Sequence, residues 1–266
     1  MKLKNIIDYI EDWAPKSLID TWDNTGFQIG SEKKDIKSIL IALDLDEDIL
    51  KKAIEDKFDL IITHHPIIFK PLKNIISTNP KEKLILDIIK NDIAVYNAHS
   101  NLDLAIGGVN DELAKLLNIK NTINLKEIFK REINGESISY GYGRIGEISE
   151  TGLEEFIGVI KSSLNIENLI LYGSIHKTIR KVAVCGGSGS DFIENAIEGK
   201  ADLYITADIK YHEAQDAYER GLTLIDVGHF HSEKIILPVI KRYLEKEFKT
   251  LSIEVVMQQS LPKKIY

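Results

Sequence analysis

The sequence predicts an α/β fold built from two similar halves, and three observations support this. The phrase AIEDKFDLIITH at 53–64 recurs as AIEGKADLYITA at 196–207, with eight of twelve positions identical. In both halves, short apolar runs alternate with amphipathic helical patterns, which favours parallel strands covered by helices. The chain's 266 residues suffice for two domains of ordinary size. We therefore expect a duplicated chain with one α/β domain in each half.

The first half begins with an amphipathic helix within residues 1–18. Acidic residues interrupt its apolar positions, so this segment is not a signal peptide. A segment rich in turn residues follows at 22–30. Beyond it the sequence predicts strands at 36–43, 59–63 and 93–97, and helices at 47–57 and 80–91. Because ligands collect at the carboxyl ends of parallel strands, the residues just past these strands are the first place to look for a site.

The middle of the chain, 120–150, loses this rhythm, and the alternating segment ESISYGYGRIGEI predicts a hairpin or edge strand. We place the domain division here, with a first half over 1–125 and a second half over 126–266. The last helix and strand could pack back on the first half. In the second half we expect helices at 151–164, 191–198, 210–220 and 232–248, and strands at 168–172, 179–185, 202–206, 223–227 and within 252–259.

Composition narrows the function. Acidic residues outnumber basic ones by 41 to 34, so the whole surface should not attract nucleic acid, although a local basic patch at Lys70 and Lys73 stays open. The single cysteine, Cys185, excludes an internal disulfide and is expected to be a buried apolar residue. No stretch approaches the roughly 18 to 20 apolar residues of a membrane span, so we expect no membrane partner and a cytoplasmic location.

Histidines gather after the predicted strands. Five of the seven do so, and two of them begin the same pattern, a histidine and a carboxylate four residues apart. The set consists of His64, His65, His99 with Asp103, His229 with Glu233, and His231. Imidazole and carboxylate groups are ligands that zinc, iron, manganese, cobalt and nickel accept. The sequence therefore predicts a metal site in the cleft between the two domains.

The adjacent pair His64 and His65 favours a dinuclear site. Neighbouring side chains of an extended backbone point in opposite directions, so the two rings suit two ions better than one. A plainer reading exists for Glu233, since a carboxylate near the start of a helix is also favoured by the helix dipole. The occurrence of the pattern in both halves outweighs that reading and predicts two divalent ions per chain.

Weaker signals lie elsewhere. The turn at 186–189 resembles a phosphate-cradling loop but lacks the Lys-Ser/Thr ending of a P-loop, and a simple strand-to-helix connector is the commoner explanation. His212, four residues after Asp208, is a candidate acid–base residue, although an exposed or capping role is equally consistent. Trp13 and Trp22 are expected in a core or interface rather than stacked on substrate. Whether the turn at Asp23 lines a pocket is left open.

With these residues assembled, the chain resembles the GTP cyclohydrolase I type 2 homologue family, also called the Nif-three-like family. The resemblance runs nearly end to end and rests on WDNTGFQIG (22–30), THHPIIFKPLK (63–73), NAHSNLDLAIGGVND (97–111), VCGGSGS (184–190), TADIKYHEAQDA (206–217) and GHFHSEK (228–234). It implies dinuclear metal ligands at His64, His65, Asp103, His229 and Glu233, with Glu233 bridging both ions. His99 falls close to the metals with its ligand status open. Ala207 departs from the family, where Gly is usual.

The resemblance also implies two similar α/β domains and a homohexamer. We expect a metal-dependent hydrolase in which the two ions activate water against a nucleotide or similar small polar substrate, while His99 or His212 shuttles the proton. The alternative is a non-enzymatic protein that handles metal, acts as a scaffold, or forms a ring that binds nucleic acid.

Overall fold

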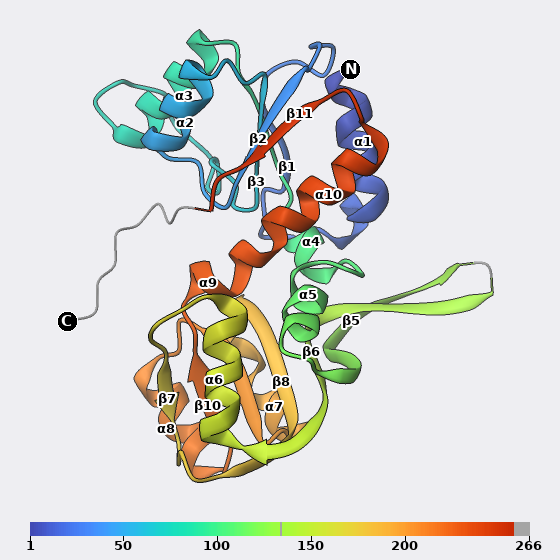
Figure 1. Cartoon of the computed structure of the whole chain (residues 1–266). Coiled ribbons are helices and arrows are strands. Elements are labelled where there is room, and N and C mark those ends of the chain that lie inside the picture. Colours follow the sequence, from blue (N-terminus) through green and yellow to red (C-terminus); the bar gives the residue numbers. More distant parts are fainter. Residues whose placement is uncertain (134, 258–266) are drawn as a thin grey trace. The chain divides into compact units, whose positions relative to one another are not determined.

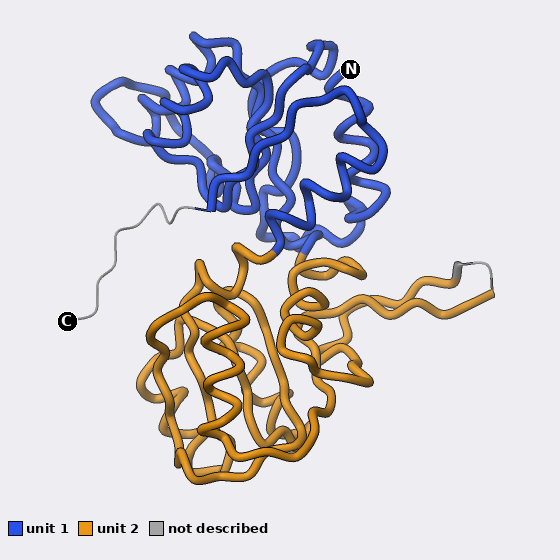
Figure 2. The backbone as a smooth tube through the Cα atoms, viewed as in Figure 1, with its two compact units in different colours: residues 1–102, 236–264, 266 blue, residues 103–235, 265 orange. Residues whose placement is uncertain are grey.

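The computed structural model describes residues 1–133 and 135–257, which fall into two compact units (Figure 2). Residues 1–102 and the described residues from Ile236 onward form unit 1, and residues 103–235 form unit 2. The chain thus passes from one unit to the other at 102–103 and back at 235–236. Leu125, where the sequence suggested a division, lies inside a strand of unit 2.

Unit 1 contains a five-stranded sheet in the order β1-β4-β3-β2-β11. Four strands are parallel, and β1 is an antiparallel edge strand beside β4. The strands are β1 (Gly26–Ile29), β2 (Ser38–Ala42), β3 (Leu60–Thr63), β4 (Ala94–Asn97) and β11 (Ser252–Val255). Their short, almost wholly buried apolar runs fit parallel strands covered on both faces.

Helices cover both faces of the unit 1 sheet (Figure 1). Helices α2 (Glu47–Glu55) and α3 (Pro80–Lys90) lie on one face, and α1 (Leu3–Trp13) and α10 (Leu237–Glu247) lie on the other. The first pair shares one apolar cluster with β2, β3 and β4. On the other face, α1 and α10 meet through stacked rings of Tyr9 and Tyr243, whose centroids are 4.4 Å apart. A short 3-10 helix, η1 (Lys16–Leu18), follows α1.

Unit 2 contains a six-stranded sheet in the order β5-β6-β8-β9-β10-β7, in which β8, β9 and β10 are parallel. The strands are β5 (Lys120–Ile133), β6 (Glu136–Gly152), β7 (Ile170–Tyr172), β8 (Thr178–Ser188), β9 (Leu203–Ala207) and β10 (Thr223–Asp226). Strands β5 and β6 form the predicted hairpin, which extends beyond the rest of the unit in Figure 1. The mixed sheet still keeps a parallel centre.

The helices of unit 2 also divide between two apolar clusters. One cluster joins α5 (Val109–Leu116) and α6 (Leu153–Leu164) to the central strands. The other joins α7 (Ile193–Glu198) and α8 (Tyr211–Glu219) to the same strands, with η2 (Ser190–Phe192) leading into α7. Since the two clusters take alternate residues of β8 and β9, each strand buries both of its faces.

Strand order confirms the duplicated α/β fold. The series β1-β4-β3-β2 of unit 1 has its counterpart in β7-β10-β9-β8 of unit 2, with an antiparallel edge strand beside three parallel strands in both. The repeated phrase ends one residue after β3 in the first copy and with the last residue of β9 in the second. The units differ at the next position, where β2 pairs with parallel β11 and β8 pairs with antiparallel β6.

Three segments differ from the sequence-based expectation. The helix predicted over 232–248 consists of α9 (His229–Glu233), η3 (Lys234–Ile236) and α10, and Pro238, which has no N–H to donate, lies in the first turn of α10. The turn-rich segment 22–30 contains strand β1. The last strand ends at Val255, and residues 258–259 of its predicted range lie outside the described residues. None of the helices in the described ranges is long and apolar enough to cross a membrane.

Candidate metal centre

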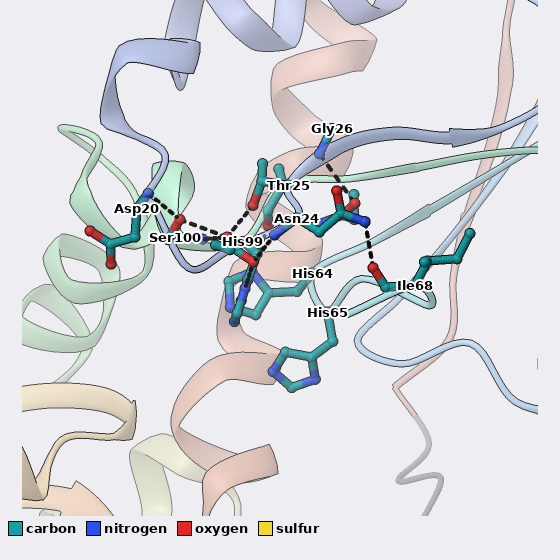
Figure 3. A network of polar contacts seen from close by, with 12 residues as sticks. Asp20, Asn24, Thr25, Gly26, His64, His65, Ile68, His99 and Ser100 are labelled. Atoms are coloured by element: carbon teal, nitrogen blue, oxygen red, sulfur yellow. Dashed lines mark hydrogen bonds and ion pairs between the residues drawn. The ribbon is translucent and has the colours of Figure 1, made fainter. Parts of the chain in front are cut away.

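Three histidines of unit 1 meet past the carboxyl ends of β3 and β4 (Figure 3). His64 and His65 directly follow β3, and His99 comes two residues after β4. One ring nitrogen from each lies within 4.8 Å of the others. His64 is fully buried, and the other two are partly buried. Three imidazole nitrogens this close are a donor set that a divalent ion accepts.

Each of these rings is held at Nδ1 by an oxygen atom. The contacts are His64 to the Ala98 carbonyl at 2.8 Å, His65 to Asp44 Oδ1 at 2.7 Å, and His99 to Asp23 Oδ1 at 2.9 Å. A carbonyl oxygen only accepts, so Nδ1 of His64 carries the proton and Nε2 carries the lone pair. The carboxylates favour the same tautomer in the other two rings. This arrangement is typical of metal-ligating histidines, whose second nitrogen donates to an oxygen.

Asp23 is the centre of a hydrogen-bond network, and Figure 3 labels three residues that bond to it, Thr25, His99 and Ser100. Besides His99, it accepts hydrogen bonds from the backbone N–H and hydroxyl of Ser100, at 3.2 and 2.6 Å, and from the hydroxyl of Thr25. Burial alone raises the pKa of Asp23, but these hydrogen bonds outweigh burial and hold its pKa well below the ordinary value. The turn that the sequence left open therefore supplies a fixed carboxylate that orients His99.

In unit 2, His229 and Glu233 begin and end the five-residue helix α9. The His229 Nε2 lies 3.0 Å from the Glu233 Oε2, and the His229 Nδ1 lies 2.7 Å from the Asp208 Oδ2. Like the unit 1 histidines, His229 has its Nδ1 held by an oxygen atom, and its Nε2 lies beside a second candidate metal ligand, Glu233. The buried Glu233 and its histidine offer an oxygen and a nitrogen at one turn of helix, a pair suited to a cation.

The glycine segment 186–189, which the sequence suggested as a turn, begins inside the last part of β8, where the pairing with β9 shifts register. This segment, called the glycine turn below, makes room for Glu233. Gly187 has a φ of +65°, and a Cβ on this residue would lie 2.1 Å from the Glu233 Oε1. Its N–H donates to the Ser232 hydroxyl at 2.9 Å, and that hydroxyl donates to the His229 carbonyl at 2.8 Å. Only glycine combines this positive φ with the absence of a Cβ that would collide with Glu233. The hydrogen bonds through Ser232 hold α9 in place.

A second buried contact ties the same turn to Asp103. The Gly186 N–H donates to the Asn110 Oδ1 at 3.0 Å, and the Asn110 amide donates to the Asp103 carbonyl at 3.0 Å. Asn110 is 1% exposed, and Asp103, in helix α4 (Ser100–Leu104), is partly buried. The glycine turn thus links both carboxylate-bearing segments of unit 2, a role the sequence did not reveal.

The remaining sequence-based candidates have other surroundings. His212 is exposed near the start of α8, with its ring centroid 5.2 Å from that of Tyr211, and Asp208 contacts His229 instead. His231 accepts a hydrogen bond at Nδ1 from the Lys234 ammonium at 3.2 Å. His212 is therefore far less constrained than the histidines that are held at Nδ1.

The cysteine and the two tryptophans lie in different surroundings. Cys185 is buried, as predicted, and burial raises the pKa of its thiol, so it behaves as a small apolar residue. Trp22, which was expected in a core or an interface, does not lie in the core, because its side chain is 58% exposed. Trp13 instead packs against Tyr243, with ring centroids 4.6 Å apart.

Sequence reasoning missed the carboxylates that hold the histidines. Asp44 lies two residues past β2, and Asp208 lies one residue past β9. The rule that singled out the histidines, position just after a parallel strand, also applies to these two residues. Asn110 and Ser232 had no such signal, since only the folded chain brings them to the glycine turn.

These features define a class: an α/β protein with imidazole and carboxylate metal-ligand candidates past the carboxyl ends of parallel strands in both of its units. Residues 1–263 match the model of Duf34/NIF3 (NGG1p interacting factor 3), and the chain belongs to this family.

Relatives support the assignment over the whole chain. A Clostridium perfringens protein named GTP cyclohydrolase 1 type 2 homolog is 40% identical over 256 residues, which cover 96% of this chain and 94% of the relative. The crystal structure of a Bacillus cereus protein related to NIF3 has a TM-score of 0.94 at 27% identity, covering 100% of this chain and 99% of the other. Reduced HcgD from Methanocaldococcus jannaschii has a TM-score of 0.81 at 34% identity, covering 96% and 97%.

Proposed function

We propose that this protein is a metal-dependent hydrolase that uses two divalent ions. The single observation that carries the proposal is the common arrangement of four histidines, each with Nδ1 held by an oxygen. With Nδ1–H donated to an oxygen, a neutral ring keeps a lone pair on Nε2, which a metal ligand requires. The donor chemistry therefore fits zinc, iron, manganese, cobalt or nickel.

The proposed ligands are His64, His65, Asp103, His229 and Glu233, with Glu233 bridging the ions as the family resemblance implies. Neither unit supplies the full set, since unit 1 contributes only imidazole ligands and unit 2 contributes both proposed carboxylate ligands. Bound ions would supply Lewis acidity and lower the pKa of water at the site. Asp44 and Asp208 keep their histidines in the ligating tautomer.

We assign His99 the transfer of the proton. Its Nδ1 is bound to the buried carboxylate of Asp23, which leaves Nε2 to accept a proton. The expected result for His99→Gln is retained metal content with turnover reduced by about 10²- to 10⁴-fold. Loss of metal from this variant would instead make His99 a ligand.

The substrate in this proposal is a nucleotide or a similar small polar molecule, and the protein assembles as a homohexamer. Both parts rest on the family resemblance. Sedimentation of the purified protein tests the assembly, because a hexamer has six times the 30.1 kDa mass of one chain.

Elemental analysis and a nucleotide-hydrolysis screen test the central proposal. The protein is compared with His64→Ala, Glu233→Ala and a matched control, His176→Ala, in which an exposed histidine is removed. We expect close to two ions per chain in the protein and the control, loss of metal in the other two variants, and turnover only where metal is retained. Two ions without turnover would favour the metal-handling alternative, and no metal under any loading condition would overturn the site.

A further inference from the structure

An exposed pair of aromatic rings flanks the histidine cluster of unit 1. Trp22 is 58% exposed and Phe69 is 39% exposed, and their ring centroids are 6.0 Å apart. Both rings are also close to His99, with centroid distances of 5.9 Å from Trp22 and 6.4 Å from Phe69. In each case the rings meet edge to face. The pair thus forms an aromatic wall beside a proposed catalytic residue.

Hydrogen bonds hold the two segments of this wall together. The Asn24 amide donates to the Ile68 carbonyl (Figure 3). The Ile68 N–H donates to the Gln28 Oε1 at 3.1 Å. The Gln28 amide in turn donates to the Asn24 carbonyl at 2.7 Å. Trp22 directly precedes Asp23, the carboxylate that orients His99. The position of the wall is therefore coupled to the position of the histidine.

Packing within the fold does not account for this wall. A large aromatic side chain gains stability by burying its surface, yet more than half of Trp22 remains accessible. Tryptophan and phenylalanine rings are, by contrast, well suited to stack on the flat face of a heteroaromatic ring. The loop that carries Phe69 also presents two exposed lysines, Lys70 and Lys73, which favour an anionic group on the same ligand.

We propose that Trp22 and Phe69 form a subsite that stacks on the flat heteroaromatic ring of the substrate, such as a nucleobase. This deepens the proposed function by naming the part of the substrate that the chain recognises, and it rests on that proposal for the chemistry beside the ring. We favour a small-molecule ring over a second copy of the chain as the occupant, because the wall directly borders the histidines that would act on a bound substrate.

Fluorescence tests the subsite directly. The chain has two tryptophans, so Trp13→Phe leaves Trp22 as the only one. The probes are guanosine, guanosine monophosphate and ribose 5-phosphate, added to metal-loaded protein. We expect the two guanine compounds to quench Trp22 emission saturably, whereas ribose 5-phosphate leaves it unchanged. If neither guanosine nor guanosine monophosphate quenches Trp22 emission, the proposal is overturned.

Alanine variants then measure the contribution of the wall by calorimetry. Trp22→Ala and Phe69→Ala should each weaken guanosine binding about tenfold or more, the range found when a stacked aromatic side chain is removed. Metal content should not change. The matched control is Tyr218→Ala, which removes a 63% exposed aromatic ring from unit 2 and should leave guanosine binding unchanged. Equal guanosine affinity in the Trp22 variant and the unaltered protein would refute the subsite.

Two further measurements separate this inference from the proposed function. Guanosine titration of the metal-free His64→Ala variant shows whether ring binding persists without metal. If Trp22-dependent binding persists although no nucleotide is hydrolysed, the subsite stands and the hydrolase proposal fails. If turnover is found but guanosine binding does not depend on Trp22, the hydrolase proposal stands and the subsite fails. A change in sedimentation of the Trp22 variant, without a change in guanosine binding, would assign the wall to a contact between copies.

Discussion

The two copies of the repeated phrase end in different chemistry. After β3 the chain continues with His64 and His65. The equivalent positions of the second copy are Ala207, the last residue of β9, and Asp208, which follows it. In unit 1 these positions supply two imidazole ligand candidates. In unit 2 the first position is a buried alanine, and the second supplies the carboxylate that holds His229. The same strand end thus provides metal-ligand candidates in one unit and an orienting group in the other.

The next strand along the chain shows the opposite relation. His99 follows β4 and His229 follows β10, and each is held at Nδ1 by a carboxylate. The carboxylates come from different places, however: Asp23 precedes β1, whereas Asp208 follows β9. The histidine thus follows the equivalent strand in both units, but a different segment supplies the carboxylate that holds it. Similar geometry at these two histidines therefore reflects the chemistry of the ring rather than a copied sequence.

The largest effect on metal binding is expected from altering the glycine turn that lies against Glu233 in unit 2. Gly187→Ala places a Cβ 2.1 Å from the Glu233 Oε1 at a positive φ, so we expect loss of metal and a lower free energy of unfolding by about 1–3 kcal/mol. Elemental analysis and urea unfolding measure the two effects. Gly158→Ala is the control, because nothing lies within 4 Å of its Cβ in α6, and alanine there should stabilise by about 0.5–1 kcal/mol. Normal metal content in the Gly187 variant would show that Glu233 is not a ligand.

A smaller effect should follow from removing the orienting carboxylate in each unit. Asp44→Asn and Asp208→Asn keep the size of the side chain but remove the charge that holds His65 and His229. We expect metal affinity to fall about 10- to 100-fold in each variant. Competition with a chelator of known affinity measures this change. Unaltered affinity in both variants would mean that the carboxylates do not tune metal ligands.

The smallest effect on metal binding is expected from Asn110→Ala, which changes stability and tests the role of the glycine turn in unit 2. The variant leaves the Gly186 N–H and the Asp103 carbonyl without their buried partner, so the free energy of unfolding should fall by about 1–3 kcal/mol. Thermal and urea unfolding provide the measurement. Asn5→Ala, at an exposed position of α1, should change stability by less than about 0.5 kcal/mol. An equal loss of unfolding free energy in the two variants would show that Asn110 has no special role.

Much of the fold could be predicted because its signals are local. Hydrophobic runs and helical periodicity located most strands and helices, and the repeated phrase revealed the duplication. The helix predicted over 232–248 is confirmed over α10, but its beginning was wrong, because a continuous apolar pattern does not show where α9 ends and η3 intervenes. The pairing of β11 with β2 joins residues more than two hundred positions apart, and no local pattern specifies such a partner.

The sequence by itself determined the α/β class, the duplication and the clustering of histidines after parallel strands, since each depends on short-range spacing and residue chemistry. Only the tertiary structure decided which oxygen holds each ring and why Gly187 must lack a side chain. It also showed that Trp22 remains exposed beside His99. The physical reason is that hydrogen bonds and close contacts depend on distances between segments far apart in the chain. Those distances exist only once the sheets have formed.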